Sequence, residues 1–462
     1  MQRIKSLSEY FTQYEKSQSD PEGFWAEIAK SFSWIEPWKK VLESDFEKVD
    51  VKWFIDGKLN ITENIFERNL IENKDKTAII WEPNNPDEDT KKISYQELYE
   101  ETCKFSNALK DLGIKKGDRI IIYMPMVPEA AIAMLACARV GAVHSVVFAG
   151  FSSTSLADRI DDCESKMVIT SDGNFRGNKV IPVKSVVDEA LEKSNSIEKV
   201  IVLKRTNQEV NFVSGRDFWW HELVKDKSSE CKAEVMDSED MLFILYTSGS
   251  TGKPKGVVHT TGGYMVYSAY TFLNVFQYDK DDIYWCTADV GWITGHSYIV
   301  YGPLLCGATS LMFEGVPTYP NVSRFWDIVD KHKVNQFYTA PTAIRALQAH
   351  GLEPLENNSL DSLKVIGSVG EPINEEAWHW YHDNIGKGNC PLVDTWWQTE
   401  TGGIMISALA GITPNKPAHA SLPLPGIIPV IVDAEGNELS GNNVQGNLCI
   451  KSPWPSILRT TY

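Results

Sequence analysis

Residues 246–256 read Tyr246-Thr247-Ser248-Gly249-Ser250-Thr251-Gly252-Lys253-Pro254-Lys255-Gly256. They follow an apolar run, residues 241–245, that predicts a buried strand. The glycines free the backbone so that N–H groups can converge on an anion, and the hydroxyls and lysines add donors and positive charge. Most loops of this composition are flexible and solvated, but here a buried strand holds one end. The stretch therefore predicts a binding site for a polyphosphate.

The spacing of the glycines argues against the common P-loop. A Walker A motif reads G-x-x-x-x-G-K-[ST], whereas Gly249 and Gly252 are too close together and Pro254 follows Lys253. We therefore expect a different phosphate-binding architecture. The alternative of a P-loop phosphotransferase is therefore disfavoured, and release of ADP in place of AMP would support it.

Three further segments complete a pattern that runs along the chain. They are Gly370-Glu371-Pro372, the run from Ala288 to Ser297 (ADVGWITGHS), and the run from Asp394 to Gly403 (DTWWQTETGG). In order and spacing, the four segments resemble the AMP-forming adenylating enzymes, which include acyl-CoA synthetases, luciferases and peptide-synthetase adenylation domains. The tandem tryptophans of the last segment and the Trp-rich N-terminus resemble the acetyl-CoA synthetase subfamily in particular. The resemblance spans essentially the whole chain.

This resemblance implies an enzyme that joins acetate to ATP, releases pyrophosphate, and passes the acetyl group from acetyl-AMP to coenzyme A. Mg²⁺ would accompany ATP, and coenzyme A would be a co-substrate. The nucleophile of adenylation is already an anion, so the site needs charge neutralisation and in-line positioning and no general base. A sequence with glycines and donors but no obvious Ser–His–Asp triad fits that requirement.

The same resemblance assigns the nucleotide site. Thr399 would hydrogen-bond the α-phosphate and act in catalysis together with Lys255, and Glu400 would bind Mg²⁺, which prefers oxygen ligands. Taken alone, Thr399-Glu400 is as well explained by a helix N-cap with an acidic first turn, and Gly370-Glu371-Pro372 by a tight turn. The remaining ATP-binding residues implied are Thr247, Ser248, Gly249, Ser250, Thr251, Gly252 and Lys253 for the phosphates, Gly370, Glu371 and Pro372 for one adenine wall, and Asp394, Thr395, Trp396, Trp397 and Gln398 for the other, with Thr399 adjoining.

Substrate selection is assigned to two more groups of residues. The acyl pocket implied consists of Ile293, Thr294, Val369 and Trp397. Trp397 would close it around acetate or propionate, although a chain with 15 tryptophans also offers the alternative of a core residue. Coenzyme A would meet Arg176, Gly177, Asn178, Lys179 and Thr294, and the alternative for the basic turn is simple solvation. His259 and His296 flank the site, and we expect His259 to be structural.

Composition limits the partners. Over 462 residues the chain is 43% hydrophobic and 23% charged, with a net charge of −17, which is typical of a soluble globular protein and argues against nucleic acid or an anionic membrane. The N-terminus lacks the apolar core of a signal peptide. The eight cysteines are scattered without a C-x-x-C pair, which favours the cytoplasm and argues against a zinc site. The sequence leaves the choice between monomer and homo-oligomer open.

Alternation of strand and helix patterns predicts an α/β fold of two doubly wound βα subdomains plus a small distorted β-barrel. We expect residues 1–60 to form a helical N-terminal extension, 61–403 the AMP-binding adenylation domain, and 404–462 a partial β-barrel. Strands are predicted at residues 78–81, 119–124, 143–148, 167–170, 199–203, 308–313, 336–340 and 363–366, and helices at 322–333, 342–350 and 375–385. The family's C-terminal lid domain is not found before Tyr462, so we expect the N-terminal part of a longer enzyme, weak or inactive by itself.

Three rivals stay open at this point. Propionate is a close variant of acetate as the substrate. A luciferase-like or carrier-protein adenylation enzyme shares the fold, but the tandem tryptophans and the N-terminal extension argue against it. A nucleotide-binding module without turnover is the rival of another class, and acetate-dependent pyrophosphate exchange would separate it from an enzyme.

Overall fold

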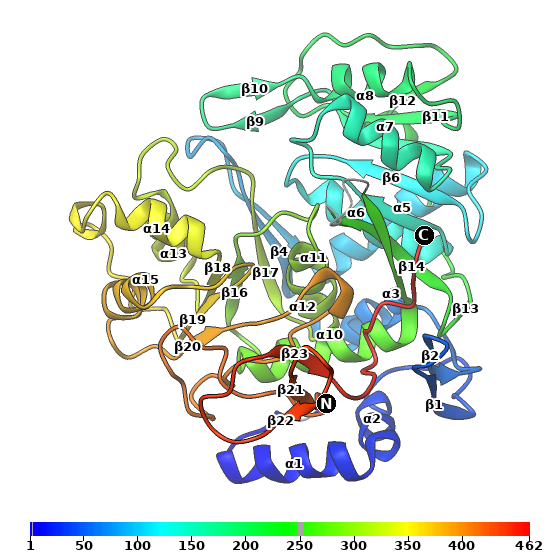
Figure 1. Cartoon of the computed structure of the whole chain (residues 1–462). Helices are drawn as coiled ribbons and strands as arrows, with labels where there is room; N and C mark the ends of the chain where they lie inside the picture. Colours follow the sequence, from blue (N-terminus) through cyan, green and yellow to red (C-terminus); the bar gives the residue numbers. More distant parts are fainter. Residues whose placement is uncertain (2, 248–253) are drawn as a thin grey trace.

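A computed structural model describes residue 1, residues 3–247 and residues 254–462. Two large sheets, each mostly parallel, organise the chain (Figure 1). The first sheet has the order β12-β11-β8-β6-β7-β14-β15-β24, and its last two pairings are antiparallel. Its strands are β6 (Arg119–Tyr123), β7 (Val143–Val146), β8 (Met167–Ser171), β11 (Lys199–Leu203), β12 (Asp217–Trp219), β14 (Met241–Thr247), β15 (Lys255–Thr260) and β24 (Thr460–Thr461).

The helices of the first sheet begin and end at residues whose chemistry suits those positions. Before α5, the Ser94 hydroxyl accepts from the Glu97 N–H, and the Glu97 carboxylate accepts from the Ser94 N–H at 2.8 Å, which makes a capping box. The helix α6 opens with Pro128 and ends at Gly141, whose φ of 75° is left-handed. These helices are α5 (Tyr95–Asp111), α6 (Pro128–Val140), α7 (Ser153–Asp162), α8 (Val183–Leu191) and α9 (Trp220–Val224).

The second sheet has the order β20-β19-β18-β16-β17-β4-β5, and only the β4–β5 pairing is antiparallel. Its strands are β4 (Thr77–Glu82), β5 (Lys91–Ser94), β16 (Ile283–Cys286), β17 (Thr309–Phe313), β18 (Gln336–Thr339), β19 (Val365–Ser368) and β20 (Leu392–Asp394). The accompanying helices are α3 (Ile61–Ile65), α4 (Glu67–Asn73), α10 (Thr261–Val275), α11 (Ile293–Gly295), α12 (Gly302–Leu305), α13 (Arg324–His332), α14 (Pro341–Gln348) and α15 (Glu375–Trp380).

The strand predicted at residues 78–81 lies in the second sheet and not in the first series, where the alternation of elements had placed it. It pairs in parallel with β17, with Ile79 opposite Ser310. The sequence pattern misled here because a strand buried on both faces is apolar throughout, and its composition does not reveal its neighbour.

Side chains of single strands alternate between two hydrophobic cores, so both faces of each sheet are covered. In β6, Ile120 and Ile122 join the large core that both sheets share, whereas Ile121 and Tyr123 face an outer core. In β16, Tyr284 faces the shared core and Trp285 the outer core of the second sheet. The shared core holds the two sheets in one body, which fixes the loops at their ends relative to each other.

The N-terminal 60 residues are only partly helical, which corrects the prediction of a helical extension. After α1 (Leu7–Ser19) and α2 (Pro21–Ala29), β1 (Lys40–Asp45) and β2 (Asp50–Ile55) form a hairpin, and β3 (Lys58–Leu59) pairs with β13 (Met236–Asp237). Trp25 of α2 and Trp53 of β2 are buried in the shared core, where their rings meet edge to face.

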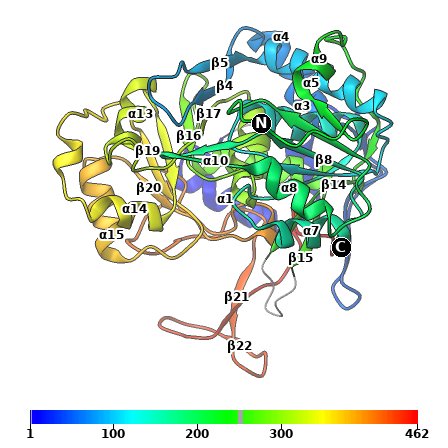
Figure 2. The same ribbon diagram turned by 90° about the horizontal axis from the view of Figure 1, so that it is seen from above.

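Residues 404–462 form an open sheet in place of the predicted barrel. The strands β21 (Pro429–Val432), β22 (Glu438–Leu439) and β23 (Asn447–Ile450) pair antiparallel, and they project from the body in Figure 2. The chain then returns to the first sheet, where β24 pairs with β15. No helix in the described part of the chain combines the length and apolarity that crossing a bilayer demands.

Candidate active site

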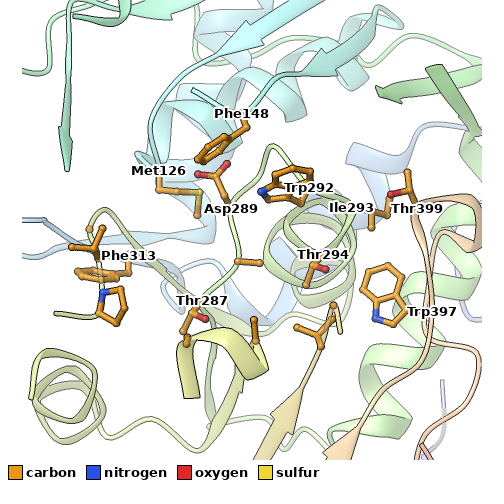
Figure 3. Close-up of a pocket in the computed structure, with 18 of the residues that line it drawn as sticks. Met126, Phe148, Thr287, Asp289, Trp292, Ile293, Thr294, Phe313, Trp397 and Thr399 are labelled. Carbon is orange, nitrogen blue, oxygen red and sulfur yellow. The ribbon is translucent and has the colours of Figure 1, made fainter. Parts of the chain in front are cut away.

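The carboxyl ends of parallel strands in both sheets open onto one cavity of about 760 Å³ (Figure 3). From the first sheet it receives Met126, which follows β6, and Phe148, which follows β7; from the second it receives the segment after β16 and the first residues after β18 and β19. Open α/β sheets bind their ligands at this edge because loops there are free to vary over a rigid frame. The cavity is therefore the candidate active site.

Residues from all the sequence-predicted groups line this cavity. Figure 3 shows Ile293, Thr294 and Trp397 together with Thr399 at one end, and Met126, Phe148 and Asp289 towards the other. The predicted residues that line it are Arg176, Thr247, Ile293, Thr294, Val369, Gly370, Trp397, Gln398, Thr399 and Glu400.

Other predicted residues lie beside the cavity and not in its lining. Asp394 and Thr395 are buried at the end of β20, where Thr395 donates from its N–H to the Ser368 carbonyl of neighbouring β19. The Glu371 carboxylate turns to α14 and accepts from Arg345 at 2.9 Å, so only the backbone of Gly370 and Glu371 is available towards a ligand. Pro372 is exposed, and Lys255 is exposed at the first residue of β15. The residues Ser248, Gly249, Ser250, Thr251, Gly252 and Lys253 lie outside the described part of the chain.

The two adjacent tryptophans serve different surfaces, because consecutive side chains of an extended segment point to opposite sides. Trp396 lines a separate apolar hollow of about 480 Å³ with Ile406 and Leu422, and its backbone bridges to Ile406. Trp397 lines the main cavity, donates from Nε1 to the Tyr338 hydroxyl at 3.3 Å, and meets the Tyr298 ring edge to face at 5.0 Å. The indole is half-buried, so one face is held by the core while another is open to the cavity.

The backbone of residues 399–402 is held from behind, so the Thr399 and Glu400 side chains are turned to the cavity. Every carbonyl of this segment accepts a hydrogen bond from a different part of the chain. The donors are His259 Nε2 to Thr399 O at 2.7 Å, Leu458 N to Glu400 O at 2.9 Å, Trp454 Nε1 and Ser456 Oγ to Thr401 O at 2.8 and 2.6 Å, and Ser297 Oγ to Gly402 O at 2.7 Å. Residues 454–458 therefore act as a brace for the segment that carries Thr399 and Glu400.

His259 holds the same segment in its neutral form. A carbonyl oxygen only accepts, so Nε2 carries the proton that it shares with Thr399 O. Burial lowers the pKa of His259 to about 3, and burial likewise lowers the pKa of His296 to about 4. Since neither ring is charged near neutral pH, the expectation that His259 is structural agrees with the geometry.

Glu400 also lines the cavity. Within the described residues, no cation or hydrogen-bond donor lies in contact with its side-chain oxygens. The same part of the chain has no group of three His, Cys, Asp or Glu side chains that could hold a metal ion unaided. Mg²⁺ is commonly bound by one or two carboxylates, with substrate phosphates completing its coordination.

Asp289 also lines the cavity, and no role was predicted for it although it belongs to the segment 288–297. Its carboxylate accepts from the Gly291 N–H at 2.7 Å, and it follows β16 at the cavity edge. Burial raises the pKa of Asp289 to about 6, while the Gly291 N–H and the Arg176 charge act in the opposite direction. An acidic residue three positions after the end of a buried strand was the signal that could have singled it out. Met126, Phe148, Trp292 and Phe313 also line the cavity unpredicted.

The basic turn expected to meet coenzyme A lines a second hollow of about 520 Å³. This hollow contains Arg176, Gly177, Asn178 and Lys179, and it shares Arg176 and Val316 with the main cavity. The two hollows therefore adjoin, and a ligand long enough could occupy both.

Comparisons with known proteins agree with this geometry. Residues 66–459 match the AMP-binding enzyme family, and residues 10–65 match the acetyl-coenzyme A synthetase N-terminus family. The acetyl-coenzyme A synthetase of Leptospira biflexa serovar Patoc is 58% identical over 464 residues, which cover 99% of this chain and 71% of that protein. This chain belongs to the acetyl-CoA synthetase family.

Other acetyl-CoA synthetases are similarly close. That of Syntrophobacter fumaroxidans is 58% identical over 454 residues, covering 98% of this chain and 70% of the relative, and that of Bdellovibrio bacteriovorus is 56% identical over 456 residues with the same shares. The chain is thus a member of a family of AMP-forming ligases, and the mixed α/β architecture of two mostly parallel sheets fits that family.

Proposed function

We propose that this chain activates acetate with ATP to acetyl-AMP and pyrophosphate, and that the same cavity passes the acetyl group to coenzyme A. The observation that carries the proposal is one cavity in which the polar residues Thr399 and Glu400 and an apolar cluster, Ile293, Val369 and Trp397, line the same space. The names of the relatives, all acetyl-CoA synthetases, support acetate as the acid.

The chemistry needs positioning more than proton transfer. A carboxylate oxygen of acetate attacks the α-phosphorus, the bond to the β-phosphate oxygen breaks, and pyrophosphate leaves with its electron pair. Thr399 would donate to an α-phosphate oxygen as charge builds up there. The residues from Thr247 to Lys255 would hold the β- and γ-phosphates, and Lys255 would stabilise the leaving pyrophosphate.

Adenine would lie between two neighbouring strand ends. One wall would be the backbone of Gly370, Glu371 and Pro372, which follow β19, and the other would be Asp394, Thr395 and Trp396 at the end of β20. Because β19 and β20 are adjacent parallel strands, the two walls start from neighbouring strand ends. Gln398 lies between this region and Thr399.

Mg²⁺ is the cofactor that fits the carboxylate of Glu400, which has no ion pair within the described residues. When bound, the ion would neutralise phosphate charge. Glu400 would hold it from the protein side, with the phosphates supplying the other ligands.

The apolar cluster would discriminate between carboxylic acids by the length of their alkyl chain. Ile293, Thr294 and Val369 would surround the methyl group, and Trp397 would close the pocket beyond it. One methylene is worth only about 1–3 kcal/mol in such a pocket, so propionate is the runner-up substrate. Coenzyme A would place its phosphates at Arg176, Gly177, Asn178 and Lys179 and direct its thiol past Thr294.

Three finer points belong to the proposal as well. A nucleotide-binding role without turnover is the alternative function, and a weakly active or inactive isolated chain stays a prediction. The cytoplasm is the proposed compartment because all eight cysteines are unpaired. Small molecules are the proposed partners, without nucleic acid or membrane, and the choice between monomer and homo-oligomer is left open.

The exchange of labelled pyrophosphate into ATP tests the first half-reaction without coenzyme A. We expect exchange that requires acetate and Mg²⁺, with propionate as the next best acid. Binding of ATP with no exchange from any short acid would favour the module without turnover. ADP as the product would contradict adenylation.

A further inference from the structure

The turn that carries Arg176 and Lys179 is held by a side chain from the other sheet. The strands β9 (Asn174–Arg176) and β10 (Lys179–Ile181) follow β8 and form a small hairpin, which is labelled in Figure 1. Asn84 follows β4 of the second sheet. Its Nδ2 donates to the Gly177 carbonyl and its Oδ1 accepts from the Gly177 N–H, both at 2.9 Å.

This pair of hydrogen bonds fixes both polar groups of one peptide residue at once. Gly177 has a φ of 61°, the left-handed conformation that a two-residue hairpin turn requires and that glycine adopts at little cost. Asn84 is 3% exposed, so water does not compete for its amide. The amide therefore ties the turn to the second sheet in the way that a neighbouring strand would.

The register of the hairpin places two cations face to face. Arg176 and Lys179 are direct cross-strand partners. Like charges in this position destabilise a hairpin, and within the described residues neither side chain forms an ion pair with a carboxylate. A turn held in place against this repulsion, and open to a hollow beside the main cavity, has the charge and geometry of an anion site.

A second contact supports the hairpin from the same direction. The Arg205 guanidinium lies 4.6 Å from the Phe175 ring of β9 and is itself bound by Glu314 and Glu88. Glu314 directly follows β17, and Glu88 lies in the loop between β4 and β5. The hairpin is thus anchored to the second sheet beside Gly177. Arg176 and Lys179 flank the turn and are exposed, and the Arg176 guanidinium lies 5.8 Å from the Phe148 ring at the edge of the main cavity.

We infer that Asn84 is a positioning residue for coenzyme A: it holds the Gly177 peptide so that Arg176 and Lys179 converge on the phosphates of the ligand's nucleotide end. The inference rests on the proposed function, since it takes coenzyme A as the ligand of the basic turn. Asn84 does not line the main cavity, where ATP is proposed to bind. Its loss should therefore weaken one substrate and spare the other.

Calorimetric titration of the chain with coenzyme A and, separately, with ATP and Mg²⁺ tests this role. Asn84→Ala removes both hydrogen bonds, and we expect the Kd for coenzyme A to rise about tenfold, with the Kd for ATP unchanged. Asn84→Asp keeps the acceptor but sets a carboxylate against the Gly177 carbonyl, so it should weaken coenzyme A at least as much. The matched control is Asn85→Ala, since the exposed Asn85 side chain accepts only from the Asp87 N–H of its own turn.

The possible results of these titrations distinguish a failure of the proposed role of Asn84 from a failure of the proposed transfer to coenzyme A. If the wild-type chain binds ATP but not coenzyme A, the proposed transfer to coenzyme A is contradicted. If wild-type binding of coenzyme A survives unchanged in folded Asn84→Ala or Asn84→Asp, Asn84 does not position the turn. Equal losses for both ligands in both variants would show a general structural role and would also overturn the inference.

Discussion

At the scale of single residues, the Trp397 indole lies half-buried between the cavity and the Tyr298 and Tyr338 side chains. The sequence left open whether this residue lines a pocket or fills the core. The structure places it in the cavity lining while its edge packs on the core.

Trp397→Gly should enlarge the acyl pocket. We expect butyrate and valerate to become substrates while kcat/KM for acetate falls, because the space opened adjoins the substrate. The stability loss should stay below the roughly 3–5 kcal/mol of a fully buried tryptophan, since one face is open. An acid chain-length series and a thermal melt on the same variant measure both effects. The buried Trp378, which lies in a different core, provides the control: Trp378→Ala should destabilise without changing acid preference.

Glu400→Gln preserves the size of the side chain but removes the charge that faces the cavity. We expect Mg²⁺-dependent adenylation to fall by about 100-fold or more, while the free energy of unfolding changes by no more than about 0.5 kcal/mol. Pyrophosphate exchange over a Mg²⁺ series gives the first value and chemical denaturation the second. Glu435→Gln, in an exposed turn, should alter neither. A Glu400→Gln variant with normal Mg²⁺ dependence would rule out the metal role.

At the scale of elements, residues 454–458 brace the segment of residues 399–402. Thr401 O receives two donors, from Trp454 and Ser456, in a buried environment. One donor is enough to satisfy the Thr401 carbonyl. The effects on stability of removing the two donors should therefore be coupled and not additive.

Ser456→Ala and Trp454→Phe should each leave Thr401 O with one hydrogen bond, but the double variant leaves it with none. A buried carbonyl without a donor costs about 1–3 kcal/mol, so the double variant should be less stable than the sum of the single losses. Denaturation of the four proteins in a double-mutant cycle measures this coupling. Strict additivity would show that the two donors do not share one acceptor.

Most strands were predicted close to their observed positions in both halves of the chain: those expected at 119–124, 167–170 and 199–203 appear at Arg119–Tyr123, Met167–Ser171 and Lys199–Leu203. Strands expected at 308–313, 336–340 and 363–366 appear at Thr309–Phe313, Gln336–Thr339 and Val365–Ser368. Their apolar runs are bounded by polar and turn-forming residues, so local pattern sets the boundaries. The brace, by contrast, joins segments more than fifty positions apart through backbone carbonyls, which carry no side-chain signal for a sequence to reveal.

At the scale of the whole molecule, the order of the strands in the two sheets could not be predicted from their order in the sequence. The strand β4 joins the second sheet although it precedes every strand of the first. Asn84 follows β4, so the place of β4 in the second sheet also brings Asn84 to the β9–β10 turn. Motif order predicted which residues belong to the candidate site, but the neighbours that hold them came only from the fold.

His144, His259 and His296 are buried with lowered pKa values, so the stability of the folded chain depends on pH in the acid range. Burial lowers the pKa of His144 well below its usual value, which is about 6.5 in an unfolded chain. Below pH 6.5 the unfolded state therefore binds a proton that the folded state does not. The contribution of His144 to stability is complete above pH 6.5 and is lost as the pH falls, by about 2 kcal/mol at pH 5.

His144→Phe tests this sign. The variant keeps the stacked ring on Phe243 but deprives the Tyr301 hydroxyl of its partner at 2.6 Å, so it should lose about 1–3 kcal/mol at pH 7. At pH 5 the difference from wild type should shrink by about 2 kcal/mol. Burial raises the pKa of Asp289 and Asp394 to about 6, which gives the opposite trend, but it is common to both proteins and cancels. Exposed His350→Gln is the control, and a difference independent of pH would contradict the prediction.

The most direct test of the central claim is a crystal structure of the chain with an alkyl ester of AMP, a stable stand-in for acetyl-AMP. We predict that the phosphate lies within hydrogen-bond reach of the Thr399 hydroxyl, with adenine between the Gly370–Pro372 and Asp394–Trp396 segments. The alkyl group should lie against Ile293, Val369 and Trp397. An ester bound outside this cavity, or bound with its alkyl group away from Trp397, would contradict the proposed site.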